Sequence, residues 1–216
     1  MGVILRSDIV AQGTLYFSNF GESPVINRAV GNDSWLAQYF ITGPHLAGYV
    51  LNSAQLLMAT ASGSPSGFSV SIYSKLTPTN YLGNLNGSDP SAGGIFTYTA
   101  SGIMLLPSTG YYVVVTASTP VAQGSYNWSQ EMSGTGIGAN GWGLQGFLKS
   151  SDGSSWSLDG RGRFYQLALY ATAVPEPSSF ALLGLASAWL LARRLTDTRG
   201  KKQFQPCKGL RKSVSP

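Results

Sequence analysis

Residues 174–194, VPEPSSFALLGLASAWLLARR, constrain the fold of this chain more than any other stretch. Pro175 and Pro177 fix φ and lack an amide hydrogen, so the segment around them cannot continue a helix or join a sheet. We therefore expect an extended, exposed connection at this point. It separates a body, residues 12–173, from the apolar segment that follows it.

The apolar run at 180–192 consists of Leu, Ala, Phe and Trp with a few Gly and Ser, and it predicts a single C-terminal hydrophobic helix. Arg193 and Arg194 follow it, as expected of a membrane stop at a cytoplasmic surface. The run rises about 20 Å against a hydrocarbon core of roughly 30 Å, so we interpret it as a temporary anchor in the inner membrane. The alternative is a buried helix of a globular domain, which is seldom apolar all round and followed by paired arginines.

Apolar and polar residues alternate along the body with a period of two, and no helical period is visible there. The clearest strands are expected at 67–75, 111–117 and 164–172, with turn signals rich in Gly, Pro, Ser and Asn between strands. Weaker strands are expected at 14–20, 35–42, 49–59, 95–100, 125–130 and 144–149. The pattern predicts a mostly β protein, an antiparallel β-sandwich that is jelly-roll-like.

Charge is unevenly distributed along the 216 residues. The formal net charge is +5, but most basic residues lie in residues 193–216, and the body is close to neutral. This distribution gives no footprint for a nucleic acid and predicts a basic, disordered tail at 195–216. The only cysteine, Cys207, lies in that tail, so an intramolecular disulfide is excluded. In residues 1–11 only Val3, Ile4 and Leu5 precede the first charge, which is too short an apolar run for a signal peptide, and we expect a truncated or mis-started N-terminus.

Catalytic, cofactor and metal sites are not expected in the body. His45 is the only histidine, and no serine or acid lies in a setting typical of a hydrolytic triad or a zinc site. Glycines at 136–141 spell GxGxxG, but the residues that follow do not form a helical pattern. Loops at 84–89 and 152–159 are rich in oxygen atoms but offer few carboxylates for calcium, so Asx turns are the simpler interpretation. We expect a protein that is not an enzyme, with no metal and no cofactor.

Aromatic side chains near loops suggest a second possibility. Trp128, Trp142 and Trp156 could stack on sugar rings, as aromatic residues of β-sandwich domains often do. The alternative function is therefore a carbohydrate-binding module that recognises exopolysaccharide.

The order of Val174, Pro175, Glu176 and Pro177, an apolar helix and paired arginines resembles the PEP-CTERM sorting signal. The resemblance implies a substrate of an exosortase, a transpeptidase-like membrane enzyme thought to cut near the motif. It also implies an exported, membrane-anchored precursor that is later delivered to the cell surface or released. Family members end soon after the arginines, whereas residues 195–216 follow here. A frameshift or readthrough would explain that extension, which puts efficient processing in doubt.

The body is similar to the choice-of-anchor R domain, in which a β domain precedes one of several surface-anchoring signals. The matching features are Tyr39 and Phe40 before Thr42-Gly43, and the segments FSVSIYS, LPSTGYYVVV and SYNWS at 68–74, 106–115 and 125–129. The resemblance implies an extended β domain and brings no catalytic residues. We thus expect a non-enzymatic protein of the cell surface or extracellular matrix.

Overall fold

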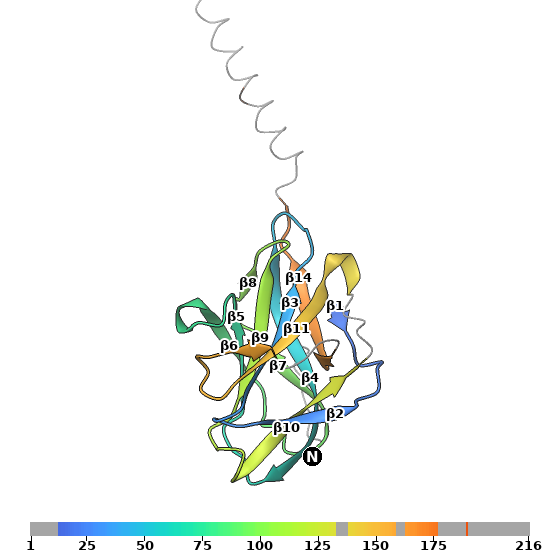
Figure 1. Ribbon diagram of the computed structural model, residues 1–216. Coiled ribbons are helices and arrows are strands. Elements are labelled where there is room, and N and C mark those ends of the chain that lie inside the picture. Colours follow the sequence, from blue (N-terminus) through green and yellow to red (C-terminus); the bar gives the residue numbers. More distant parts are fainter. Residues whose placement is uncertain (1–12, 133–137, 159–162, 177–188, 190–216) are drawn as a thin grey trace, which may run out of the picture. The chain divides into compact units, whose positions relative to one another are not determined.

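Strand β4 (Tyr49–Gly63) is a long internal strand of the folded body and pairs with other strands on both edges (Figure 1). The computed structural model describes residues 13–132, 138–158, 163–176 and 189. Within these residues the regular structure is almost entirely antiparallel β-sheet, apart from the short 3-10 helices η1 (Pro78–Asn80) and η2 (Ala139–Gly141). The predicted class, mostly β with antiparallel sheets, is confirmed.

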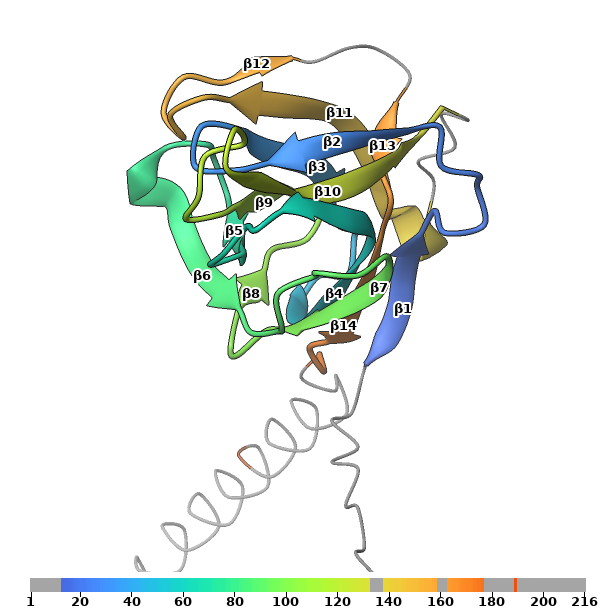
Figure 2. The ribbon, with the colours of Figure 1, turned by 90° about the horizontal axis from the view of Figure 1, so that it is seen from below.

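Two sheets enclose a common interior, which Figure 2 shows from below. The first sheet has the order β1 (Thr14–Ser18), β14 (Leu167–Ala173), β4, β10 (Gly124–Glu131) and β13 (Phe164–Tyr165). In the same sheet, β2 (Ile26–Val30) pairs with β10, while β7 (Gly94–Thr99) and β8 (Met104–Leu105) pair with β4. The second sheet has the order β12 (Ser157–Leu158), β11 (Gly143–Ser150), β3 (Trp35–Ile41), β9 (Gly110–Thr116), β5 (Ser69–Tyr73) and β6 (Tyr81–Leu85). This arrangement is consistent with the expected β-sandwich.

A bulge in β4 allows one long strand to bury side chains along most of its length. Ser53 pairs with Tyr170, whereas Leu51 pairs with the next residue of β14, Ala171, so Asn52 is the extra residue. Leu51 is buried before the bulge and Ala54 after it. An extra residue shifts the period-two alternation by one position, so both halves of β4 face the core.

Large aromatic side chains fill much of the core between the sheets. The fully buried Trp128 of β10 stacks on Tyr165 with ring centroids 4.3 Å apart, and Phe147 of β11 meets Tyr165 edge-on at 5.3 Å. The indole Nε1–H of Trp128 donates to the Gln166 carbonyl at 3.0 Å. The hydrogen bond satisfies the one polar atom of a large ring that would otherwise be costly to bury.

A buried glutamine joins the two sheets. The Gln38 side chain, on β3, accepts a hydrogen bond from the Tyr165 amide at 2.8 Å and donates to the Gly146 carbonyl at 2.9 Å. It lies opposite the bulge in β11, where the register skips Gly146. A glutamine is tolerated here because its oxygen and its amide both find backbone partners.

All nine strands expected from the sequence are present within one to four residues of their predicted bounds. The segment expected at 164–172 is divided into β13 and β14 by Gln166. Four strands were missed: β2, β6, β8 and β12. Strands β8 and β12 contain two residues each, and β6 is mostly exposed, so neither length nor alternation marks them in the sequence.

A tyrosine–carboxylate pair fixes the end of the sandwich where β10 begins. The Tyr126 hydroxyl donates to Oδ2 of Asp89 at 2.7 Å, and the Gly67 amide donates to the same oxygen at 3.1 Å. Burial and the hydrogen bond to Asp89 raise the pKa of Tyr126 above its ordinary value of 10.0. Burial and the charge of Asp89 raise the pKa of the neighbouring Tyr98 as well.

Replacing Tyr126 with Phe should lower the free energy of unfolding at pH 7 by about 1–3 kcal/mol, because Asp89 loses a donor. A raised pKa in the folded state means that this contribution is complete below about pH 10 and is lost as the pH rises further. The variant should therefore lose less stability than the wild type between pH 9 and 11. Urea unfolding across that range measures both effects. If the wild type and the Tyr126→Phe variant lost the same free energy of unfolding between pH 9 and 11, the hydrogen bond between Tyr126 and Asp89 would be contradicted.

Candidate functional site

Val174, the residue that directly follows the body, is held on both of its backbone groups. Ala173 of β14 pairs with Tyr49, and the Val174 amide then donates to the Gly48 carbonyl at 3.0 Å. The Val174 carbonyl oxygen lies 2.7 Å from Nε2 of His45. A carbonyl only accepts, so Nε2 carries the hydrogen in this contact. The described structure divides into two units directly after Val174.

The loop at 42–48, between β3 and β4, provides both of these partners. The Thr42 hydroxyl donates to the Leu106 carbonyl at 2.6 Å and accepts from the Thr109 amide at 3.0 Å. The Ser108 amide donates to the Gly43 carbonyl at 2.9 Å. These bonds fix the 42–48 loop against the 104–109 segment, so His45 is presented to Val174 by a supported loop.

Two glycines make this loop possible. Gly48 has a φ of +77°, which L residues with a side chain rarely adopt, and its amide closes a turn onto the His45 carbonyl. At Gly43 a Cβ would collide with the Asn140 carbonyl oxygen and would lie 2.8 Å from the Tyr49 hydroxyl. The backbone approaches too closely at Gly43 for any side chain.

A small cavity of about 340 Å³ opens beside this junction. It is lined by Tyr16, Pro44, His45, Tyr49, Asn140, Gly141 and Ala173. Burial, with a smaller effect from Tyr49, raises the pKa of the Tyr16 hydroxyl, so the phenol is neutral at physiological pH. The polar side-chain groups of the lining are two phenols, one imidazole and one amide, and none of these is a carboxylate.

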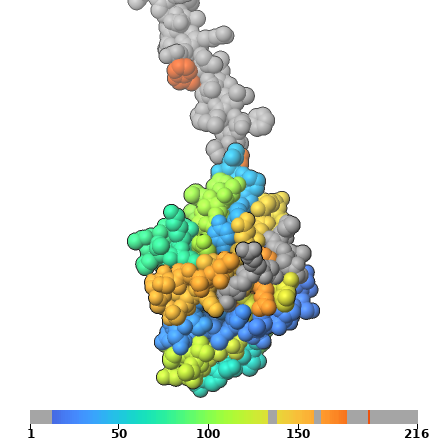
Figure 3. Space-filling model, in the orientation of Figure 1, coloured from blue at the N-terminus to red at the C-terminus, as the bar shows by residue number. Residues whose placement is uncertain are grey.

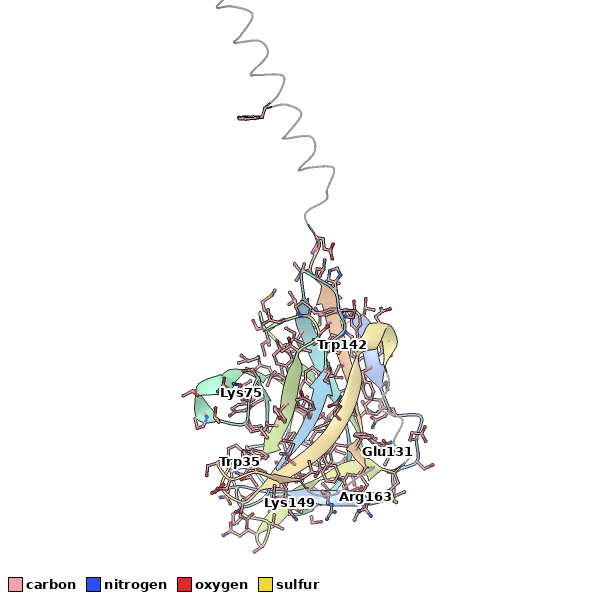
Figure 4. All side chains as sticks on the ribbon, turned by 45° about the horizontal axis from the view of Figure 1, so that its top comes forward. Trp35, Lys75, Glu131, Trp142, Lys149 and Arg163 are labelled. Carbon is pink, nitrogen blue, oxygen red and sulfur yellow. The ribbon has the colours of Figure 1, made fainter. Side chains whose placement is uncertain are left out.

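Trp142 is buried directly before β11 (Figure 4) and packs behind two residues of the cavity lining, Tyr16 and Tyr49. Its ring stacks on Tyr16 at 5.0 Å and on Phe40 at 6.0 Å, and it meets Tyr49 edge-on at 5.0 Å. This cluster joins β1, β3, β4 and the segment entering β11. The packing of one tryptophan therefore holds together the strands that position Val174.

The three tryptophans expected to stack on sugars lie in different environments. Trp128 and Trp142 are fully buried in the core, so neither offers a face to a glycan, and we withdraw that part of the prediction. Trp156 is half-buried on the hairpin between β11 and β12, and its Nε1–H donates to the Gly153 carbonyl at 3.1 Å. Sequence alone could not separate these cases, because all three follow or precede turn-rich segments.

The loop at Asp152 forms the expected Asx turn. Its Oδ1 accepts from the amides of Ser154 and Ser155 at 2.9 and 2.8 Å, and from the Ser150 hydroxyl at 2.8 Å. These donors, the Ser155 amide first, hold the pKa of the carboxyl well below its usual range. One carboxylate already satisfied by the backbone is a poor start for a calcium site. Within the described ranges, three or more His, Cys, Asp or Glu side chains do not gather anywhere as metal ligands would.

Most of the predicted anchoring segment lies outside the described residues. Val174 is half-buried, while Pro175 and Glu176 are exposed and lack regular secondary structure, as predicted. The described residues do not include Pro177, Arg193, Arg194, nearly all of the apolar run or the tail. In the described part of the chain, helices of the length and apolarity needed to span a membrane are absent.

Comparison with known families identifies the segment that starts where β14 ends. Residues 173–194 match the PEP-CTERM protein-sorting motif. A search of curated proteins gives no match to the chain. The motif supports an exported protein whose membrane-anchored precursor is processed by an exosortase. The sorting motif thus begins at Ala173, a residue still paired in the sheet, and its Val174 is held by His45 and Gly48.

The close approach at Gly43 can be tested by a single methyl group. Gly43→Ala should lower the free energy of unfolding by about 1–3 kcal/mol or more, because the added Cβ has no space beside Asn140. Gly21→Ala is the matched control, because nothing lies within 4 Å of a Cβ there. Its effect should stay within about 0.5 kcal/mol. Equal stability of the two variants in urea would contradict the described loop packing.

The His45 contact makes a separate prediction about the end of β14. His45→Ala should speed hydrogen exchange at the Val174 amide about fivefold, the effect of losing a hydrogen bond of about 1 kcal/mol. Leu46→Ala, at the exposed neighbouring position, should leave that amide unchanged. Unchanged exchange at Val174 in the His45 variant would show that the imidazole does not hold the end of the strand.

Proposed function

We propose that this chain is a non-enzymatic protein of the cell surface or extracellular matrix, delivered there through its sorting motif. The observation that carries the proposal is the motif at 173–194, which continues without a linker from the last strand of the body. The precursor is anchored in the inner membrane, and an exosortase then processes it near Pro175-Glu176-Pro177. The body is the part that reaches the surface.

The geometry of the body suits this role. Both backbone groups of Val174 are hydrogen-bonded to the 42–48 loop, whereas Pro175 and Glu176 are exposed. An enzyme that cuts beyond Val174 would leave every strand of both sheets intact. Cleavage beyond Val174 would therefore leave the packing of the folded body unchanged.

A passive role fits the chemistry of the described residues. The Nε2 atom of His45 lies 2.7 Å from a backbone carbonyl oxygen, that of Val174. The described lining of the nearby cavity consists of phenols, an imidazole, an amide and apolar groups, without a carboxylate. We further propose that the body is a choice-of-anchor R domain, on the strength of the aromatic and turn segments described above.

Carbohydrate binding is the weaker alternative. A second cavity of about 250 Å³ is lined by Asp33, Lys149 and five serines, mostly from the hairpin that carries Trp156. Hydroxyl groups next to one half-buried tryptophan resemble the polar part of a sugar site. Because Trp128 and Trp142 are buried, this hypothesis now depends on Trp156 alone among the predicted residues.

Alanine at Pro175, Glu176 and Pro177 should trap the chain in the membrane fraction, because the recognition motif of the exosortase is lost. The measurement is the cell fraction and intact mass of the protein in a strain that has its exosortase. Wild-type protein should leave the membrane fraction, and its intact mass should correspond to a chain that ends near residues 174–177 and lacks the tail.

Two controls make this result specific. Alanine at Ser178 and Ser179, which directly follow the Pro175-Glu176-Pro177 triplet within the matched segment, should leave release unchanged. A strain without the exosortase should retain the wild-type protein and the variant with alanine at Ser178 and Ser179 in the membrane at full length. Release of the triple variant at the wild-type level would contradict the proposed sorting.

A further inference from the structure

One end of the sandwich carries exposed apolar side chains on the two loops beside Val174. Leu46 is 81% exposed, Leu106 64% and Met104 52%. The three residues belong to the 42–48 loop and the 104–109 segment, which are joined by the hydrogen bonds of Thr42 and Gly43. We call this set, Leu46, Met104 and Leu106, the apolar end. Figure 3 shows both segments together at the top of the body, in light blue and light green.

The apolar end is also free of formal charge. Neither loop contains Asp, Glu, Lys or Arg, and His45 is the single titratable side chain in the two segments. Lys75 follows β5 at the same end of the second sheet, since Tyr73 pairs with Tyr112. A lysine at the rim would be attracted to an anionic lipid surface.

The opposite end of the sandwich is acidic and polar. Asp33 precedes β3, Asp89 follows β6 and Asp152 follows β11, all at the far ends of these strands. Lys149 and Trp35 lie at this end, away from Trp142 (Figure 4). The body therefore has one apolar end whose two loops carry no carboxylate and one end with three carboxylates.

Chain length places the apolar end close to the membrane while the precursor is anchored. Val174 is fixed at this end, and residues 175–179 alone separate it from the apolar run that begins at Phe180. Five residues span at most about 18 Å even when fully extended. The polar layer on each side of a bilayer is several ångströms thick. The tether therefore leaves little room between the apolar end and the hydrocarbon core of the membrane.

We propose that the apolar end rests on the surface of the bilayer, with Leu46, Met104 and Leu106 in the interfacial layer, until the exosortase releases the body. This proposal depends on the membrane-anchored precursor of the proposed function. Exposed leucines and methionine gain apolar surroundings there, and the three carboxylates of the opposite end stay away from the lipid. A released body would lose the tether and leave the membrane.

Fluorescent labels on the full-length precursor test the proposal. Cys207 is first replaced by Ser, and an environment-sensitive label is attached to Leu46→Cys, Leu106→Cys or Leu158→Cys. Leu158 is the matched control, a leucine 60% exposed at the edge of the second sheet. The precursor, purified from a strain without the exosortase, is reconstituted in vesicles of phosphatidylethanolamine and phosphatidylglycerol. Emission at 46 and 106 should shift to the blue and be quenched by labelled lipid, and emission at 158 should not.

A loss-of-contact variant adds a quantitative test. Leu46→Ser with Leu106→Ser should lower the ratio of docked to undocked body about tenfold, read from a label at Met104→Cys. Leu158→Ser should leave that ratio unchanged.

Three outcomes overturn the proposal. Labels at 46, 106 and 158 could be equally exposed to water in vesicles. Shielding at 46 and 106 could appear without lipid and rise with protein concentration, which would indicate a second copy of the chain. The serine pair could leave docking unchanged. Failure of the precursor to associate with membranes at all would instead contradict the proposed sorting, so the two failures are distinguishable.

Discussion

The pairing of β14 with β4 is the interaction on which the rest of this structure depends. Strand β14 lies between β1 and β4 in the first sheet, so the C-terminal strand of the body is an internal strand. The backbone amides and carbonyls of β14 therefore form hydrogen bonds with β1 on one edge and with β4 on the other. This pairing ends just before Pro175, which has no amide hydrogen to donate. Because the sorting motif begins at the last residue of this strand, the sheet is completed where the motif starts.

Burial of aromatic rings explains why that end of the sheet is well defined. Trp142 packs against Tyr16, Phe40 and Tyr49, which come from three different strands. The same packing brings the 42–48 loop and the Asn140 turn together over Gly43, and so places His45 beside Val174. A contact that looks local at the junction is a consequence of core packing between strands far apart in the sequence.

Strand β5 was predictable because period-two alternation reports burial on one face of a sheet, and β9 because a short run that is apolar on both faces is typical of a central strand. Strands β6, β8 and β12 were not, since exposed or two-residue strands carry no such alternation. Among the site residues, the sorting motif could be identified from its local order of residue types. The burial of Trp128 and Trp142 could not, because tryptophan next to a turn occurs both in cores and on surfaces.

The sequence by itself determined the mostly β class, the stop at Pro175 and the sorting motif, because each depends on residues that are adjacent in the chain. Only the tertiary structure decided which aromatics are buried, that His45 holds the Val174 carbonyl, and that Leu46, Met104 and Leu106 share one end. These features arise from pairing between strands that are distant in the chain. The hydrogen bonds between the 42–48 loop and the 104–109 segment, for instance, join residues more than sixty positions apart.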